Sequence, residues 1–151
     1  MAKRVIMGLG VGVAAVASAW VMGCKTDHAA ATKNDPAFTT AQAQIDHGAK
    51  VFGNNCAKCH GASGEGGKAP ALVGKDALPL TRPGAKRRTG EFRTAMDIAA
   101  FVTKNMPPSE EARAKLTERD YWSVLAFALN ANGVKLTEPV GPQNASAIKI
   151  H

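Results

Sequence analysis

Aromatic side chains are scarce in this chain of 151 residues, of which Phe, Trp and Tyr together make up 5%. A short chain buries a smaller share of its surface than a long one, and large rings supply much of what a small core buries. The sequence therefore predicts that a non-protein group fills part of the interior, or that much of the chain lies outside the folded part. We expect both.

Cysteine is also scarce, with three residues in the chain. Three thiols leave one unpaired under any disulfide scheme, and an odd thiol in an exported protein needs an explanation. A zinc site would need a second pair of ligands, but the chain has no other Cys pair and no two histidines three to five residues apart. The sequence therefore argues against structural zinc.

Strand-like alternation of apolar and polar residues is missing throughout the chain. Helical spacing of apolar residues is present instead, and it predicts three helices, at about 40–56, 94–104 and 117–132. The second and third of these each begin with a Thr-x-x-Asp capping box. The fold class is predicted to be all-α.

The N-terminus has the pattern of an export signal, because Lys3 and Arg4 precede an uncharged apolar run over residues 5–23. The run ends in VMGC, which resembles a bacterial lipobox and predicts a lipid on Cys24 after cleavage before it. Cleavage after Ala-Ser-Ala at 17–19 and retention as an uncleaved anchor are alternatives, since 19 uncharged residues are about enough to span a bilayer. All three predict export, and we favour a lipid-anchored protein on the periplasmic face of a bacterial membrane.

Composition divides the chain into four parts. After the predicted signal peptide, residues 24–40 are small and polar and are expected to form a flexible linker. Residues 41–133 hold all the helical spacing and are expected to form the folded domain. Residues 134–151 contain two prolines and no helical spacing, so a disordered tail is predicted there.

Cys56, Cys59 and His60 form a Cys-x-x-Cys-His motif, which is the attachment signature of c-type haem. Thiols at positions i and i+3 of a helix lie on one side, where each can add to one vinyl group, and the histidine then projects over the iron. A redox dithiol of the thioredoxin type would need a βαβ context, which the sequence lacks. The motif predicts one covalently bound haem c. If the remaining Cys24 is acylated, the chain has no unpaired thiol left.

Residues 45–133 resemble a class I monohaem cytochrome c. The similarity rests on GAKVFGNNCAKCHGASGEGGKAPALVG, DIAAFVTKNMPP and LTERDYWSVLAFALNANG, and it is weak over residues 74–93. The resemblance implies a small fold of three to four helices packed around one haem. It also implies that Gly48 and Phe52 of the first helix cross the last helix near the positions of Val124 and Phe127.

The resemblance also implies a set of ligands. Pro70 would offer its carbonyl to the Nδ1–H of His60, which fixes the tautomer and leaves Nε2 for iron. Met106 matches the axial methionine of the family and is followed by two prolines; a thioether ligand favours Fe(II) and raises the potential. His28, His47 and His151 are alternatives to Met106 only in principle, and we expect them on the surface or in the linker and tail.

Basic residues are concentrated over residues 82–93, and 17 Lys and Arg remain against 12 Asp and Glu once the predicted signal is removed. The basic residues of this segment are Arg82, Lys86, Arg87, Arg88 and Arg93. A basic patch beside a haem edge would steer an acidic redox partner. Pairing with the haem propionates, contact with anionic lipids and a simple solvated loop are alternatives. Nucleic acid is not an expected partner, because the protein is predicted to be exported and aromatics are not interleaved with the patch.

Two strong axial ligands leave no open position on the iron, so the sequence predicts an electron-transfer protein, with no small-molecule substrate and no enzymatic activity. Ser109, Glu110 and Glu111 follow Met106 and are expected to begin a solvated linker rather than to act as acids or bases. One alternative is a haem subunit of a dehydrogenase or oxidase complex. Another is a gas-binding haem sensor, if Met106 does not bind the iron.

Overall fold

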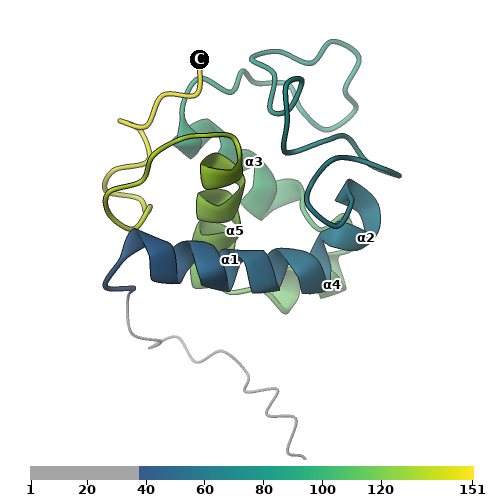
Figure 1. Ribbon diagram of the computed structural model, residues 1–151. Helices are drawn as coiled ribbons and strands as arrows, with labels where there is room; N and C mark the ends of the chain where they lie inside the picture. The colour runs from purple at the N-terminus through teal and green to yellow at the C-terminus, as the bar shows by residue number, and fades with distance from the viewer. Residues whose placement is uncertain (1–37) are drawn as a thin grey trace, which may run out of the picture. The chain divides into compact units, whose positions relative to one another are not determined.

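A computed structural model of the chain describes residues 38–151, which contain five helices (Figure 1). The helices are α1 (Ala41–Asn55), α2 (Ala57–His60), α3 (Ala95–Asn105), α4 (Glu110–Ala114) and α5 (Glu118–Ala131). Over this range there is no strand, and one isolated bridge joins Thr94 to Lys149. The prediction of an all-α fold is confirmed. The predicted signal peptide, Cys24 and His28 lie outside the described residues.

None of the helices between residues 38 and 151 has the length and apolar character needed to cross a bilayer.

The predicted helix starts are confirmed by their caps. The Thr40 side chain accepts a hydrogen bond from the Ala43 N–H at the start of α1. Thr94 before α3 and Thr117 before α5 each form a complete capping box with the aspartate three residues later. These caps satisfy backbone N–H groups that the first turn of a helix leaves unpaired, which is why local sequence is enough to place them.

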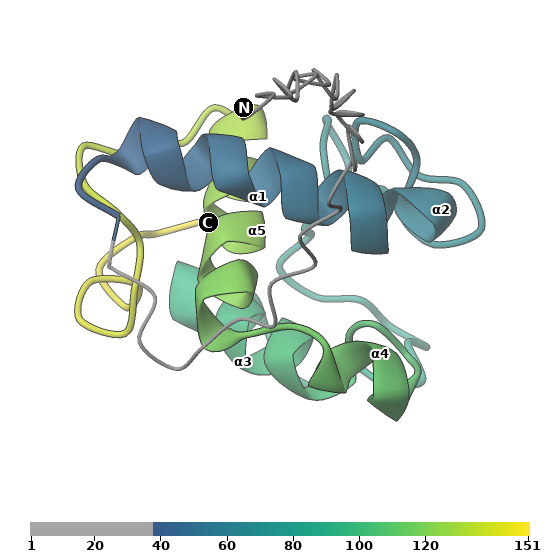
Figure 2. The ribbon, with the colours of Figure 1, turned by 90° about the horizontal axis from the view of Figure 1, so that it is seen from below.

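The first and last long helices, α1 and α5, cross in contact with each other (Figures 1 and 2). A Cβ atom added to Gly48 would overlap the backbone carbonyl oxygen of Ser123, so only glycine permits this approach. Phe52 is buried beside the crossing, with its ring centroid 5.1 Å from that of Phe127. The predicted crossing is confirmed at Phe127. The backbone that Gly48 meets is that of Ser123, whereas Val124 lines a cavity.

The core lies where α3 and α5 pack together and extends under the loops. Its most deeply buried members include Ala95, Ile98, Leu125, Ala126 and Leu129.

The C-terminal segment, residues 134–151, departs from the predicted disordered tail. Buried Gln44 of α1 donates from Nε2 to the Val140 carbonyl at 2.8 Å and accepts from the Val140 N–H at 2.7 Å. The Ala95 N–H, at the start of α3, donates to the Ile148 carbonyl at 3.0 Å. The prediction was wrong because apolar residues of this segment cover core left open by the helices, and its backbone finds partners on α1 and α3.

Candidate functional site

The candidate site is a crevice made of an outer cavity of about 540 Å³ and an adjoining inner cavity of about 100 Å³. It is bounded by α2, α3, α5 and the loop 61–93. The larger volume is within the range of small-molecule and cofactor sites. Six residues line both cavities: His60, Leu72, Leu78, Phe92, Phe101 and Met106. Apart from His60 these side chains are apolar, so the crevice suits a large hydrophobic group.

The Cys-x-x-Cys-His motif sits at the junction of two helices rather than inside one. Cys56 caps α1, its N–H donating to the Phe52 carbonyl at 2.8 Å, and α2 then carries the rest of the motif. Both thiols are free; Cys56 lines the inner cavity, whereas Cys59 is exposed. Burial, with a smaller contribution from Cys59, raises the pKa of the Cys56 thiol to about 11. One thiol therefore faces the crevice and the other lies at the surface.

His60 is oriented by the loop that follows the motif. Its Nδ1 donates a hydrogen bond to the Pro70 carbonyl at 2.7 Å, since a carbonyl oxygen can only accept. The hydrogen bond expected between these two residues is therefore present. Nε2 makes no hydrogen bond with any residue in the range 38–151, so it is left free to bind a metal.

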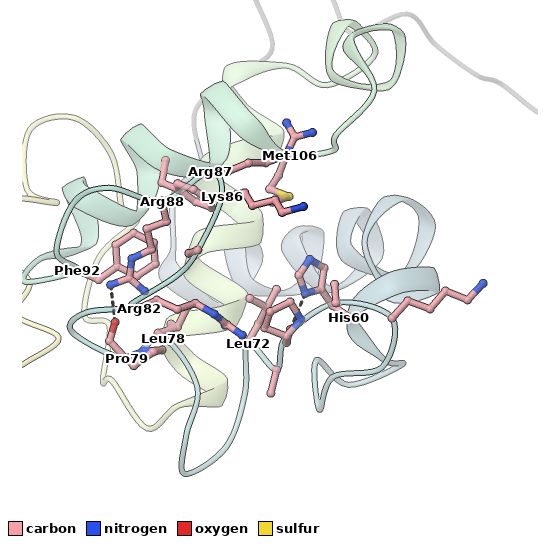
Figure 3. A pocket seen from close by; sticks show the side chains of 16 residues that line it. His60, Leu72, Leu78, Pro79, Arg82, Lys86, Arg87, Arg88, Phe92 and Met106 are labelled. Atoms are coloured by element: carbon pink, nitrogen blue, oxygen red, sulfur yellow. Dashed lines mark hydrogen bonds between the residues drawn. The ribbon is translucent and has the colours of Figure 1, made fainter.

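Met106 lies on the opposite side of the crevice from His60, as Figure 3 shows. It is the residue that caps α3, with an extended backbone, and its N–H donates to the Val102 carbonyl at 2.9 Å. An imidazole and a thioether thus approach the same apolar space from two sides. This is the donor pair expected for a low-spin haem iron, and the residues present fit a haem.

The backbone that follows Met106 accepts hydrogen bonds from two side chains. Tyr121 Oη of α5 donates to the Met106 carbonyl at 2.9 Å. Arg113 Nη1 of α4 donates to the carbonyls of Pro107 at 2.8 Å and Pro108 at 3.0 Å. Burial raises the pKa of the Tyr121 hydroxyl above its usual range. Neither residue was predicted. A linker was expected to begin at residue 109, whereas Glu110 and Glu111 form the first turn of α4, which carries Arg113. The partner of Tyr121 lies 15 residues away, so no local pattern indicates its contact.

The basic segment divides into buried and exposed members. Arg88 is buried: it donates to the carbonyls of Pro79, Leu80 and Gly90, and its guanidinium lies 3.4 Å from the centre of the Phe92 ring. Arg88 therefore holds the loop together and is not free to meet a partner.

The exposed cations gather at the outer cavity. Arg82, Lys86 and Arg87 line it together with Lys68 (Figure 3). Arg93 lies apart from them and pairs with Glu91. The opening of the crevice is therefore positively charged.

The histidines of the described region outside the motif are engaged elsewhere. His47 Nε2 lies 2.8 Å from Asp120 Oδ1 and His151 Nε2 lies 2.8 Å from the Leu78 carbonyl, and neither histidine lines the crevice. Burial acts to raise the pKa of Asp120, but hydrogen bonds from Thr117 and His47 outweigh it and lower that pKa. Both were expected at the surface: His151 is exposed and His47 is half-buried, and each makes a defined contact.

Between residues 38 and 151, no group of three or more His, Cys, Asp or Glu side chains is placed to hold a metal ion.

The model of the family described as cytochrome c oxidase, cbb3-type, subunit III matches residues 43–127. Among solved structures, a chain in the crystal structure of the sulfane dehydrogenase SoxCD from Paracoccus pantotrophus is similar over 70% of this chain, at 28% identity and a TM-score of 0.52. The match covers 52% of that chain, so this chain spans about half of it. The search of curated proteins finds no significant match.

Proposed function

The chain belongs to the c-type cytochrome family described as cytochrome c oxidase, cbb3-type, subunit III, and from this premise we propose that it transfers single electrons through a haem bound by His60 and Met106. The cofactor of this domain is haem c, covalently bound. The resemblance to class I cytochromes c and the cytochrome c fold are confirmed by the family match and the structural similarity.

The observation that carries the proposal is the placement of His60 and Met106 on two sides of one apolar crevice. A haem held by His60 and Met106 would supply one-electron redox chemistry, and these two ligands would leave no position for a substrate. The protein residues then have separate roles. Cys56 and Cys59 tether the cofactor, Pro70 orients the imidazole, and the apolar walls exclude water from the metal. On this proposal the chain is not an enzyme by itself.

The cations at the opening of the crevice support a proposal about partners. Arg82, Lys86, Arg87 and Lys68 are exposed around the outer cavity, where a redox protein would approach the cofactor. An acidic docking surface on that protein would raise the rate of encounter. We place the protein at the periplasmic face of a bacterial membrane, anchored through Cys24, on the strength of the lipobox-like sequence.

A second candidate is a haem subunit held permanently in a dehydrogenase or oxidase complex. It is supported by the similarity to a chain in a sulfane dehydrogenase structure. Carrier and subunit use the same haem site and differ in whether the partner dissociates. Sizing the protein isolated from its native membrane would separate them, because a carrier runs alone and a subunit runs with its complex.

The proposed ligation is tested by the optical spectrum of the protein made in a host that attaches c-type haem. We expect the weak far-red band of methionine sulfur on iron in the ferric form, and no rapid response of the reduced form to carbon monoxide. Absence of the band together with prompt binding of the gas would overturn His60/Met106 ligation and favour a gas-binding haem sensor.

A further inference from the structure

We infer that Tyr121 and Arg113 are positioning residues that hold the methionine loop, residues 106–109, so that the Met106 thioether stays on the iron. This inference rests on the proposed His60/Met106 ligation and adds the means by which one ligand is kept in place.

The methionine loop has few backbone donors of its own. Pro107 and Pro108 have no N–H, so neither can donate a hydrogen bond. The carbonyls of three successive residues, Met106 to Pro108, accept instead from side chains of α4 and α5. Since these donors come from outside the loop, the path of the loop depends on them.

Met106 is fixed on both sides of its own Cα. Its N–H donates to the Val102 carbonyl within α3, and its carbonyl accepts from the Tyr121 hydroxyl 2.9 Å away. Tyr121 also lines the inner cavity, so one side chain forms part of the crevice wall and holds the ligand loop. Loss of the hydroxyl would free the carbonyl side of Met106 while leaving the ring in the wall.

Helix α4 brings Arg113 back onto the loop. Ser109 caps α4, and the Arg113 N–H donates to the Ser109 carbonyl at 3.0 Å, which returns the chain by one turn. The half-buried guanidinium then reaches the Pro107 and Pro108 carbonyls from a single nitrogen, Nη1. The short helix α4, which lies where a linker was expected, therefore carries this arginine to the loop.

Carbon monoxide binds the reduced iron only in molecules whose thioether has left it, so the rate of binding measures the population of that open state. Removing a neutral hydrogen bond is expected to raise that population about fivefold, and removing a charged donor shared by two carbonyls about tenfold or more.

The test uses the full holoprotein and the variants Tyr121→Phe, Arg113→Met and both together. Lys115→Met is the matched control, because Lys115 is a cation at the end of the same helix. Among the described residues, its ammonium group pairs with Glu111 and makes no contact with the methionine loop. We expect carbon monoxide to bind about fivefold faster in Tyr121→Phe, about tenfold or more in Arg113→Met, faster still in the double variant, and at the wild-type rate in Lys115→Met. The far-red band should also weaken in the same order.

Any other result overturns either the proposed His60/Met106 ligation or the positioning role of Tyr121 and Arg113. A wild-type protein without the far-red band overturns the proposed ligation, and this inference falls with it. A wild-type band together with unchanged binding rates in all variants overturns the inference alone. If the rates rise only in proportion to a global loss of helical circular dichroism, the two residues stabilise the fold and do not position the ligand. An equal rise of the binding rate in Lys115→Met would also show that Tyr121 and Arg113 do not position the ligand.

Discussion

Gly48 shows how a single residue fixes the distance between two helices. The resemblance implied that this glycine meets the last helix, and the structure confirms close approach to the Ser123 carbonyl. The role of Arg88 was not predicted. Its partners are the carbonyls of Pro79, Leu80 and Gly90, which lie together only because the loop folds back on itself. Sequence indicates a glycine's contact when a helix pattern surrounds it, but not which cation of a basic segment is buried.

At this scale we predict that Gly48→Ala lowers the free energy of unfolding of the holoprotein by about 3 kcal/mol, because the new methyl group meets a backbone oxygen that cannot move aside. Gly53→Ala, in the same helix, is the control. A Cβ there meets nothing within 4 Å, so the substitution should stabilise by about 0.5 kcal/mol through helix propensity. Guanidinium unfolding curves measure both, and equal effects would contradict the close contact.

Helices α1, α3 and α5 were predicted close to their observed bounds because their caps and apolar spacing are local features of the sequence. The C-terminal segment was missed because what orders it is not local. Its hydrogen bonds with Gln44 join residues 96 positions apart, and no pattern within residues 134–151 predicts them. Helix α4 was missed because five residues carry too little periodicity to distinguish a helical turn from a linker.

At the scale of elements we predict that Gln44→Ala costs about 2 to 3 kcal/mol, since it leaves the buried N–H and carbonyl of Val140 without partners. Gln42→Ala, an exposed glutamine on the same helix that bonds only to Asp46, is the control and should change stability by less than about 0.5 kcal/mol. Thermal unfolding and hydrogen exchange over residues 136–150 check the prediction. If Gln44→Ala unfolds like the control, the C-terminal segment is not held by this residue.

Over the described part of the molecule, the basic residues of the segment 82–93 have different surroundings. Arg88 is committed to the interior and Arg93 to an ion pair, whereas Lys86 and Arg87 remain exposed at the opening of the crevice. The sequence predicted the excess of charge but not this division, because burial of one member depends on how the loop closes. The motif residues and Met106 were predicted to meet at one site, and the structure brings His60, Cys56 and Met106 to one crevice.

At the scale of the whole molecule we predict that the double variant Lys86→Glu and Arg87→Glu slows oxidation of the reduced protein by ferricyanide, an anion, several-fold at low salt. The difference should shrink as salt screens the surface. The double variant Lys50→Glu and Lys135→Glu is the control for net charge, because it also reverses two exposed cations and neither of them lines the crevice. Stopped-flow absorbance gives the rates, and equal slowing in the control would show that the position of the charge does not matter.

The contact of α1 with α5 has a consequence for the order of assembly. The first long helix cannot complete its packing until the last one exists, and the chain between them carries the haem-attachment motif and the methionine loop. On the proposed export with the N-terminus leading, Cys56, Cys59 and His60 would emerge well before α5. We therefore expect a time window in which both thiols are accessible to the attachment machinery, and its length is set by how soon residues 118–131 arrive to close the crossing.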